Sequence, residues 1–385
     1  MGFVSQDDLL NQMTVNGKYG IQFQTKSTAP VHTAGGWHLL SGLNGYPNAS
    51  TFPATADLVF SSVDENSGDG TTLLGGYMGG PVGSATKHIT SVSASIVAAA
   101  GAPWVACLVD LQAYFRMATT NVTGTGSRTL ISSNTFTASS SSGLLLTYTN
   151  DFKSGTKVRF TTTTTLPTGL SLATDYWLVR VTSTTARVAT SYANYIAGTV
   201  IAYTDGGTGT HTLTCQIPRY TDGAGCEAFW VAQTQPTAGG PTLSASSYTN
   251  TAGTAARAFQ GSVVMNATAD AYACRILHSG NAAGRYGPFL PKQGADAGIK
   301  SIESFTWSAG TAYTGSGVVA LCIAKPLLWL PASATGVWTE RDCVNQLRSL
   351  PQIKDGACLQ WMLFGTGATT TASPFNASIE YAWGG

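Results

Sequence analysis

The chain has little charge: Asp, Glu, Lys and Arg make up 10% of its 385 residues, and 20 basic residues nearly balance 19 acidic ones. A net charge of +1 gives no basic field for a phosphate backbone, so we expect no nucleic-acid partner. No window approaches the roughly 18 apolar residues of a membrane span, and the start, MGFVSQDDLLNQ, lacks the regions of a secretion signal. These absences predict a soluble protein with no membrane partner and no signal for secretion.

Catalytic and cofactor motifs are missing as well. The 44 glycines form neither a phosphate-binding loop nor a dinucleotide fingerprint, and no Gly-x-Ser-x-Gly elbow occurs. The five histidines lack metal-ligand spacing. The acidic run 64–70 departs from a helix–loop–helix calcium site, and Asp222 and Glu227 are more simply a turn and a strand residue than a catalytic pair. We therefore expect no enzyme, no metal and no cofactor.

The seven cysteines are an odd number, and several lie within apolar runs. Cys107, Cys322 and Cys358 follow this pattern, which is typical of small buried thiols. Reduced core cysteines favour synthesis in a reducing cytoplasm.

Helix signals are scarce and occur at two places. Near the start, Ser5 and Asp8 have capping-box spacing, and Gly17 can end the helix. Near the end, Thr339 and Asp342 repeat the spacing and predict a second short helix. Most other segments are short runs of β-branched and aromatic residues separated by Gly, Asn, Asp and Pro, so we expect an all-β protein.

The segment 131–214 differs in composition from its flanks, because 32 of its 84 residues are Ser or Thr. Its run DYWLVRV places Tyr176 and Leu178 on one side of a strand and Trp177 and Val179 on the other. Its size and its number of short strands fit an immunoglobulin-like β-sandwich inserted into a larger body.

With this segment set aside, two parts of the body are similar in sequence, and we call this similarity the internal echo. Residues 87–114 align with 298–329, so that Ile89 meets Ile299, Val92 meets Ile302 and Cys107 meets Cys322. A duplication and a pair of merely similar hairpins explain the match equally well. A duplication predicts two tandem, jelly-roll-like β-sandwiches after an N-terminal helix. The expected units are 1–16 (helix or arm), 17–130 (first sandwich), 131–214 (insert) and 215–385 (second sandwich with the C-terminal helix and closing strands).

Several phrases resemble structural proteins of tailed bacteriophages. In the insert, LPTGLSLATDYWLVRV followed by YTDGGTGTHTLT is similar to modules found in phage head and tail proteins. In the body, PRYTDGAGCEAFWVAQ and LPQIKDGACLQWMLF resemble phage structural proteins. The resemblance implies a non-enzymatic virion component, made in the bacterial cytoplasm, whose partners are the major capsid protein and copies of itself. A capsid decoration or cement protein is the first hypothesis.

The N-terminal helix is the candidate docking or oligomer contact. Leu9, Leu10 and Met13 share one face, and so short a helix needs a partner for it. Burial of this face against the protein's own body is the equal alternative.

Two other functions remain open. A tail, baseplate or fibre component would bind a host-surface glycan through Tyr176, Trp177 or Tyr192 of the insert. A glycan depolymerase is the third hypothesis and requires a cleft with two close carboxylates.

Overall fold

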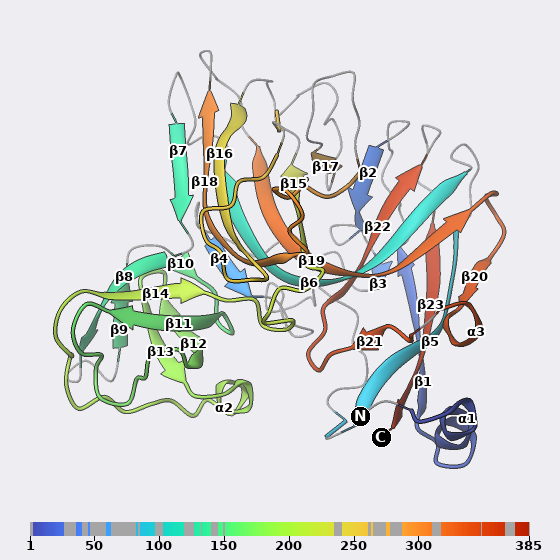
Figure 1. Cartoon of the computed structure of the whole chain (residues 1–385), viewed down its shortest axis with the longest axis horizontal. Coiled ribbons are helices and arrows are strands. Elements are labelled where there is room, and N and C mark those ends of the chain that lie inside the picture. Colours follow the sequence, from blue (N-terminus) through green and yellow to red (C-terminus); the bar gives the residue numbers. More distant parts are fainter. Residues whose placement is uncertain are drawn as a thin grey trace.

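A computed structural model gives the fold (Figure 1). It describes residues 3–26, 36–40, 45–46, 59–62, 82–83, 85–96, 103–118, 127–131, 133–139, 145–148, 151–234, 241–260, 263–264, 275–277, 287–309, 317–347, 349–365 and 374–384. Strands predominate among these residues, so the predicted all-β class is confirmed.

Two sheets form the larger part of the body. The six-stranded sheet runs β20 (Thr339–Asp342), β5 (Thr86–Ile96), β23 (Phe375–Gly384), β1 (Tyr19–Lys26) and β3 (Gly45–Tyr46), with β21 (Gln352–Ile353) also beside β5. The eight-stranded sheet runs β10 (Asp151–Phe152), β4 (Val59–Ser62), β6 (Trp104–Ala118), β19 (Val318–Ala332), β15 (Glu227–Thr234), β17 (Arg275–Leu277), β2 (Gly36–Leu39) and β22 (Leu359–Gly365). Because β22 also pairs with β6, the strands from β6 to β22 in this order form a ring, and β4 and β10 lie outside it.

A three-stranded sheet and a separate barrel complete the fold. The three-stranded sheet runs β16 (Pro241–Asn250), β18 (Ile299–Ala309) and β7 (Ser127–Ile131). The closed barrel runs β11 (Lys157–Thr162), β12 (Asp175–Thr182), β13 (Thr185–Ala189), β9 (Leu145–Tyr148), β8 (Ser133–Ser139) and β14 (His211–Cys215).

The body contains two sandwiches that share their longest strands. One core cluster joins the six-stranded sheet to the start of β6 and the end of β19; its members include Ile89, Val92, Phe375, Leu108 and Leu328. Another cluster joins the three-stranded sheet to the opposite ends of the same two strands; its members include Ile302, Trp307, Phe115, Met117 and Leu321. Strands of 15 residues are long enough for their two ends to serve different cores.

This sharing corrects the expected boundaries 17–130 and 215–385. Strands β22 and β23 from the C-terminal segment pack with β1 and β5 from the N-terminal segment. Strand β7, expected in the first unit or at its border, pairs with β18. Each sandwich is therefore built from strands before and after the inserted segment. Antiparallel pairing can join strands that are far apart in the sequence.

The central pairing places the strands of the two similar segments side by side. In the antiparallel pair of β6 and β19, Cys107 lies opposite Trp329 and Tyr114 lies opposite Cys322. The segments IPRYTDGAGC (217–226) and LPQIKDGAC (350–358) add a further echo, since each leads into a strand beside the central pair.

The inserted segment forms a closed six-stranded barrel in place of the expected two-sheet immunoglobulin-like sandwich. Pairing of β13 with β9 and of β14 with β8 leaves no open side edge, which closes the sheet. Tyr176 and Leu178 point into its core, as the alternation predicts. Ser133 and Thr214 are paired neighbours, so the chain enters and leaves the barrel at one place. The barrel projects from one end of the body (Figure 1).

The helices agree with the sequence at the N-terminus and differ elsewhere. Helix α1 (Gln6–Thr14) has Ser5 as its N-cap, and Gly17 adopts a φ of +63° after it. At the second site the expected cap is wrong: the backbone from Thr339 to Asp342 pairs with β5, and Asp342 caps the one-turn helix α3 (Cys343–Gln346). Helix α2 (Tyr192–Ile196), capped by Ser191, lies in the inserted segment.

Six cysteines are buried thiols, as expected: Cys107, Cys215, Cys226, Cys322, Cys343 and Cys358. Burial raises the pKa of Cys226 to about 12 and that of Cys343 to about 11, which suppresses the reactive thiolate.

We predict that these six thiols resist labelling in the folded protein. The test uses a Cys274→Ser variant, which removes the cysteine outside the described residues. In mildly alkaline buffer, a disulfide-exchange reagent that releases colour on reaction with thiols should give almost none with the folded variant. All six thiols should react in guanidinium chloride. Rapid labelling without denaturant would contradict the buried placement.

Candidate binding surfaces

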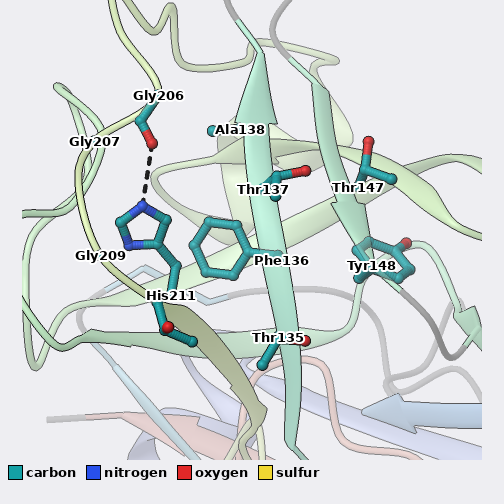
Figure 2. Close-up of a pocket in the computed structure, with 11 residues that line it drawn as sticks. Thr135, Phe136, Thr137, Ala138, Thr147, Tyr148, Gly206, Gly207, Gly209 and His211 are labelled. Atoms are coloured by element: carbon teal, nitrogen blue, oxygen red, sulfur yellow. Dashed lines mark hydrogen bonds between the residues drawn. The ribbon is translucent and has the colours of Figure 1, made fainter.

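An open groove lies on the barrel, where β8 and β9 meet the loop that leads into β14 (Figure 2). It has a volume of about 630 Å³, within the range of small-molecule sites. Its lining comprises Thr135, Phe136, Thr137, Ala138, Thr147, Tyr148, Gly206, Gly207, Gly209, Thr210 and His211. None of these residues is acidic, and His211 is the sole titratable base among them.

His211 fixes one wall of the groove. Its Nε2 lies 3.1 Å from the carbonyl oxygen of Gly206 and its Nδ1 lies 2.9 Å from the hydroxyl of Thr162. A carbonyl oxygen can only accept, so Nε2 carries a proton, and Nδ1 of the neutral ring can accept from the hydroxyl. The Phe136 ring packs beside the imidazole, with ring centroids 5.3 Å apart. Both ring nitrogens of His211 therefore have hydrogen-bond partners within the protein.

The loop over the groove is held by the neighbouring segment 162–168. Thr165 and Thr208 exchange backbone hydrogen bonds, and Asp205 accepts from the backbone and the hydroxyl of Thr168. A Cβ on Gly207 would lie 2.6 Å from the carbonyl oxygen of Thr165, and the φ of Gly207 is +69°. Glycine is required there because the two backbones approach so closely. The groove is thus preformed.

The three predicted glycan contacts lie in different environments in the structure. Tyr176 is 3% exposed and its hydroxyl accepts from the backbone of Ser171, so its ring is core and this prediction is corrected. Trp177 is half-buried, and the Lys157 ammonium lies 5.6 Å from its ring. Tyr192 begins α2 and packs against Tyr195, with ring centroids 5.8 Å apart. Neither Trp177 nor Tyr192 lines the groove.

The predicted docking residues of α1 divide between the core and the surface. Leu9 is buried, Met13 is half-buried and Leu10 is exposed. The helix contacts β1 and β23 of the same chain. The apolar face is therefore covered in part by the protein's own body, and Leu10 is left outside it.

The neighbouring strand β1 has an inverted pattern that the sequence reasoning missed. Its apolar side chains Tyr19, Ile21 and Phe23 are 36%, 45% and 64% exposed, whereas Gln22 and Gln24 are buried. The two buried amides satisfy each other in part, because Gln24 Nε2 donates to Gln22 Oε1 at 2.8 Å. We call Tyr19, Ile21 and Phe23 the β1 face. A contiguous exposed apolar stripe of this kind is typical of interaction sites.

Other chemistry is sparse among the described residues. They contain no group of three or more His, Cys, Asp or Glu placed to hold a metal ion. Asp222 accepts from the backbone of Ala224 in a turn, whereas Glu227 forms an ion pair with Lys292. The acidic run 64–70 lies outside the described residues. No helix in the described part of the chain is long and apolar enough to cross a membrane.

Comparison with known proteins gives no family. No family model matches the chain, and no curated protein matches it. Solved structures of infectious bursal disease virus overlap it weakly. The Gx strain structure has 8% identity over 94% of this chain and 80% of the other, with a TM-score of 0.16. A mutant VP2 protein in derived T=1 particles has 9% identity over 97% and 82%, also with a TM-score of 0.16. Similarities this low carry no argument about function.

Proposed function

We propose that the chain is a structural component of a virus particle, of the capsid decoration type, that attaches through the β1 face beside α1. The observation that carries the proposal is the inversion of β1, which leaves Tyr19, Ile21 and Phe23 in solvent. Burying an exposed apolar side chain contributes roughly 1.5 to 3 kcal/mol, so a partner surface would gain directly from covering this face.

The arrangement of the elements fits attachment at one end. Strand β1 and α1 lie toward one end of the molecule, and the barrel projects at the other (Figure 1). Attachment through β1 would therefore leave the barrel away from the particle surface. The partners we propose are the major capsid protein and further copies of this chain in a repeating lattice, where many weak contacts add together.

The sparse charge of the chain is consistent with this role. With 10% charged residues, its surface depends little on ion pairs that salt would screen. The closed barrel also leaves no side edge for unwanted strand pairing.

We predict that Ile21→Asp/Phe23→Asp weakens binding to particles at least tenfold, about 1.4 kcal/mol. Two charges on the β1 face would have to be desolvated at the contact. Both positions are exposed, so the variant should fold normally. Co-sedimentation with purified empty heads of the parent virus, and separately with its tails, measures the binding.

The matched control is Leu172→Asp/Val181→Asp, which places the same two charges at exposed apolar positions of the inserted segment. It should bind heads like the unchanged protein. Saturable binding to heads that the double variant loses supports the proposal. Binding to tails alone, or undiminished binding of the double variant, contradicts it.

A further inference from the structure

We propose that the groove on the barrel binds a neutral oligosaccharide. This is an activity beyond attachment to a particle, and it uses residues at the other end of the molecule from the β1 face (Figure 1). Four features of the groove carry the inference.

The first feature is the absence of charge. The lining contains no Asp, Glu, Lys or Arg, and both ring nitrogens of His211 are already bonded, to Gly206 and Thr162. A charged ligand would lose hydration here without gaining an opposite charge, which costs free energy. Phosphorylated, sulfated and acidic ligands are therefore disfavoured.

The second feature is a set of available hydroxyl groups. Thr135, Thr137 and Thr147 have exposed side chains, and within the described residues nothing hydrogen-bonds to the hydroxyls of Thr137 and Thr147. Thr137 and Thr147 are cross-strand partners on β8 and β9, so their side chains stand on the same face. A hydroxyl can both donate and accept, which suits a ligand rich in hydroxyls.

The third feature is the lack of a free strand edge beside the groove. The Phe136 and Tyr148 rings are 4% and 3% exposed, so they pack in the barrel core and support the groove from inside (Figure 2). Peptide addition to the sheet is disfavoured, because β8 already pairs on both sides within the barrel.

The fourth feature is rigidity. The hydrogen bonds between 163–168 and 205–210 hold the loop in place without a ligand. A preformed groove loses less conformational entropy on binding than a loop that must order. The open shape and the volume of about 630 Å³ favour a chain of several sugar units over a single enclosed one.

Saturation-transfer NMR on the full chain tests this inference. The neutral probes are oligosaccharides of glucose, mannose, galactose and N-acetylglucosamine, and the charged probes are oligogalacturonate and a heparin oligosaccharide. We expect saturable binding to at least one neutral probe and none to the charged probes. Failure of every neutral probe, or equal binding of a charged one, would overturn the inference.

Variants assign the binding to the groove. Thr137→Val/Thr147→Val removes both hydroxyls while keeping the β-branched shape, and it should weaken binding at least tenfold. Thr161→Val is the matched control, since Thr161 is an exposed barrel threonine outside the groove. If the double variant melts at a lower temperature, the single variant Thr137→Val replaces it.

Trp177→Ala distinguishes the groove from the other aromatic surface of the barrel. Binding should survive this change, because Trp177 does not line the groove. Loss of binding in Trp177→Ala with full binding in the threonine variants would overturn the assignment. Head binding through the β1 face is measured separately, so either proposal can fail alone.

Discussion

Asp110→Ala is expected to lower the free energy of unfolding by about 3 to 5 kcal/mol, the cost of breaking a buried ion pair. Asp110 is fully buried in β6 and accepts from Arg219 Nε at 3.0 Å and Nη2 at 2.7 Å. It also accepts from the backbone N–H of Cys358 at 2.9 Å. Removing the carboxylate leaves a buried guanidinium and a buried N–H without this acceptor.

The ion pair of Asp110 joins three segments of the chain, so its loss should destabilise the body as a whole. The pair joins β6 to the two echo segments, 217–226 through Arg219 and 350–358 through Cys358. Arg219 also donates to the carbonyl of Leu111 at 2.6 Å, so its head group cannot turn to solvent without losing several bonds. Chemical denaturation followed by tryptophan fluorescence measures the loss.

Two controls separate this effect from ordinary loss of charge. Glu227→Gln alters the pair with Lys292, whose side chains keep 16% to 20% exposure, and it should cost less than Asp110→Ala because water still reaches both partners and the amide keeps an acceptor oxygen. Asp110→Leu/Arg219→Leu removes both charges and should be more stable than Asp110→Ala, because no buried charge is left alone. An Asp110→Ala variant as stable as Glu227→Gln would contradict the account.

Trp230→Ala is expected to cost about 3 to 5 kcal/mol, as large-to-small changes at buried aromatic residues do. Trp230 of β15 is fully buried, and its ring centroid lies 4.9 Å from those of both Phe305 and Trp307 on β18. These edge-to-face contacts join the eight-stranded sheet to the three-stranded sheet. Truncation would leave a cavity at that junction.

The matched control for Trp230 is Trp338→Ala. Trp338 is 52% exposed, and its removal should change stability by less than about 0.5 kcal/mol. Thermal or denaturant unfolding of the two variants side by side gives the comparison. Equal losses at the two positions would contradict the placement of Trp230 in the core.

Local pattern was enough to predict the fold class and the first helix. The alternation of Tyr176 and Trp177 in β12 matches their burial, and Ser5 caps α1 as its spacing indicates. These features depend on residues that are neighbours in sequence. The all-β class and the inserted segment follow from the same kind of local evidence.

Long-range pairing could not be predicted in the same way. Asp110 and Arg219 are 109 residues apart, and nothing near either residue identifies the other as its partner. Strands β22 and β23 come from the C-terminal segment and pack with β1 and β5 from the N-terminal segment. This arrangement likewise depends on pairing between the two ends of the chain.

The surfaces were the least predictable feature. In YGIQFQTK the structure exposes Ile21 and Phe23 and buries Gln22 and Gln24, the reverse of what the polarity of these side chains favours. The groove depends on the packing of Thr165 against Thr208, whereas the sequence shows only a glycine-rich turn there. Both surfaces arise from tertiary contacts, which sequence alternation does not encode.

The orientation of the protein on a particle tests the central claim most directly. Cryo-electron microscopy of empty heads saturated with the protein should show β1 and α1 against the shell and the barrel pointing away from it. Density with the barrel against the shell and β1 in solvent, or heads without added density, would contradict attachment through the β1 face.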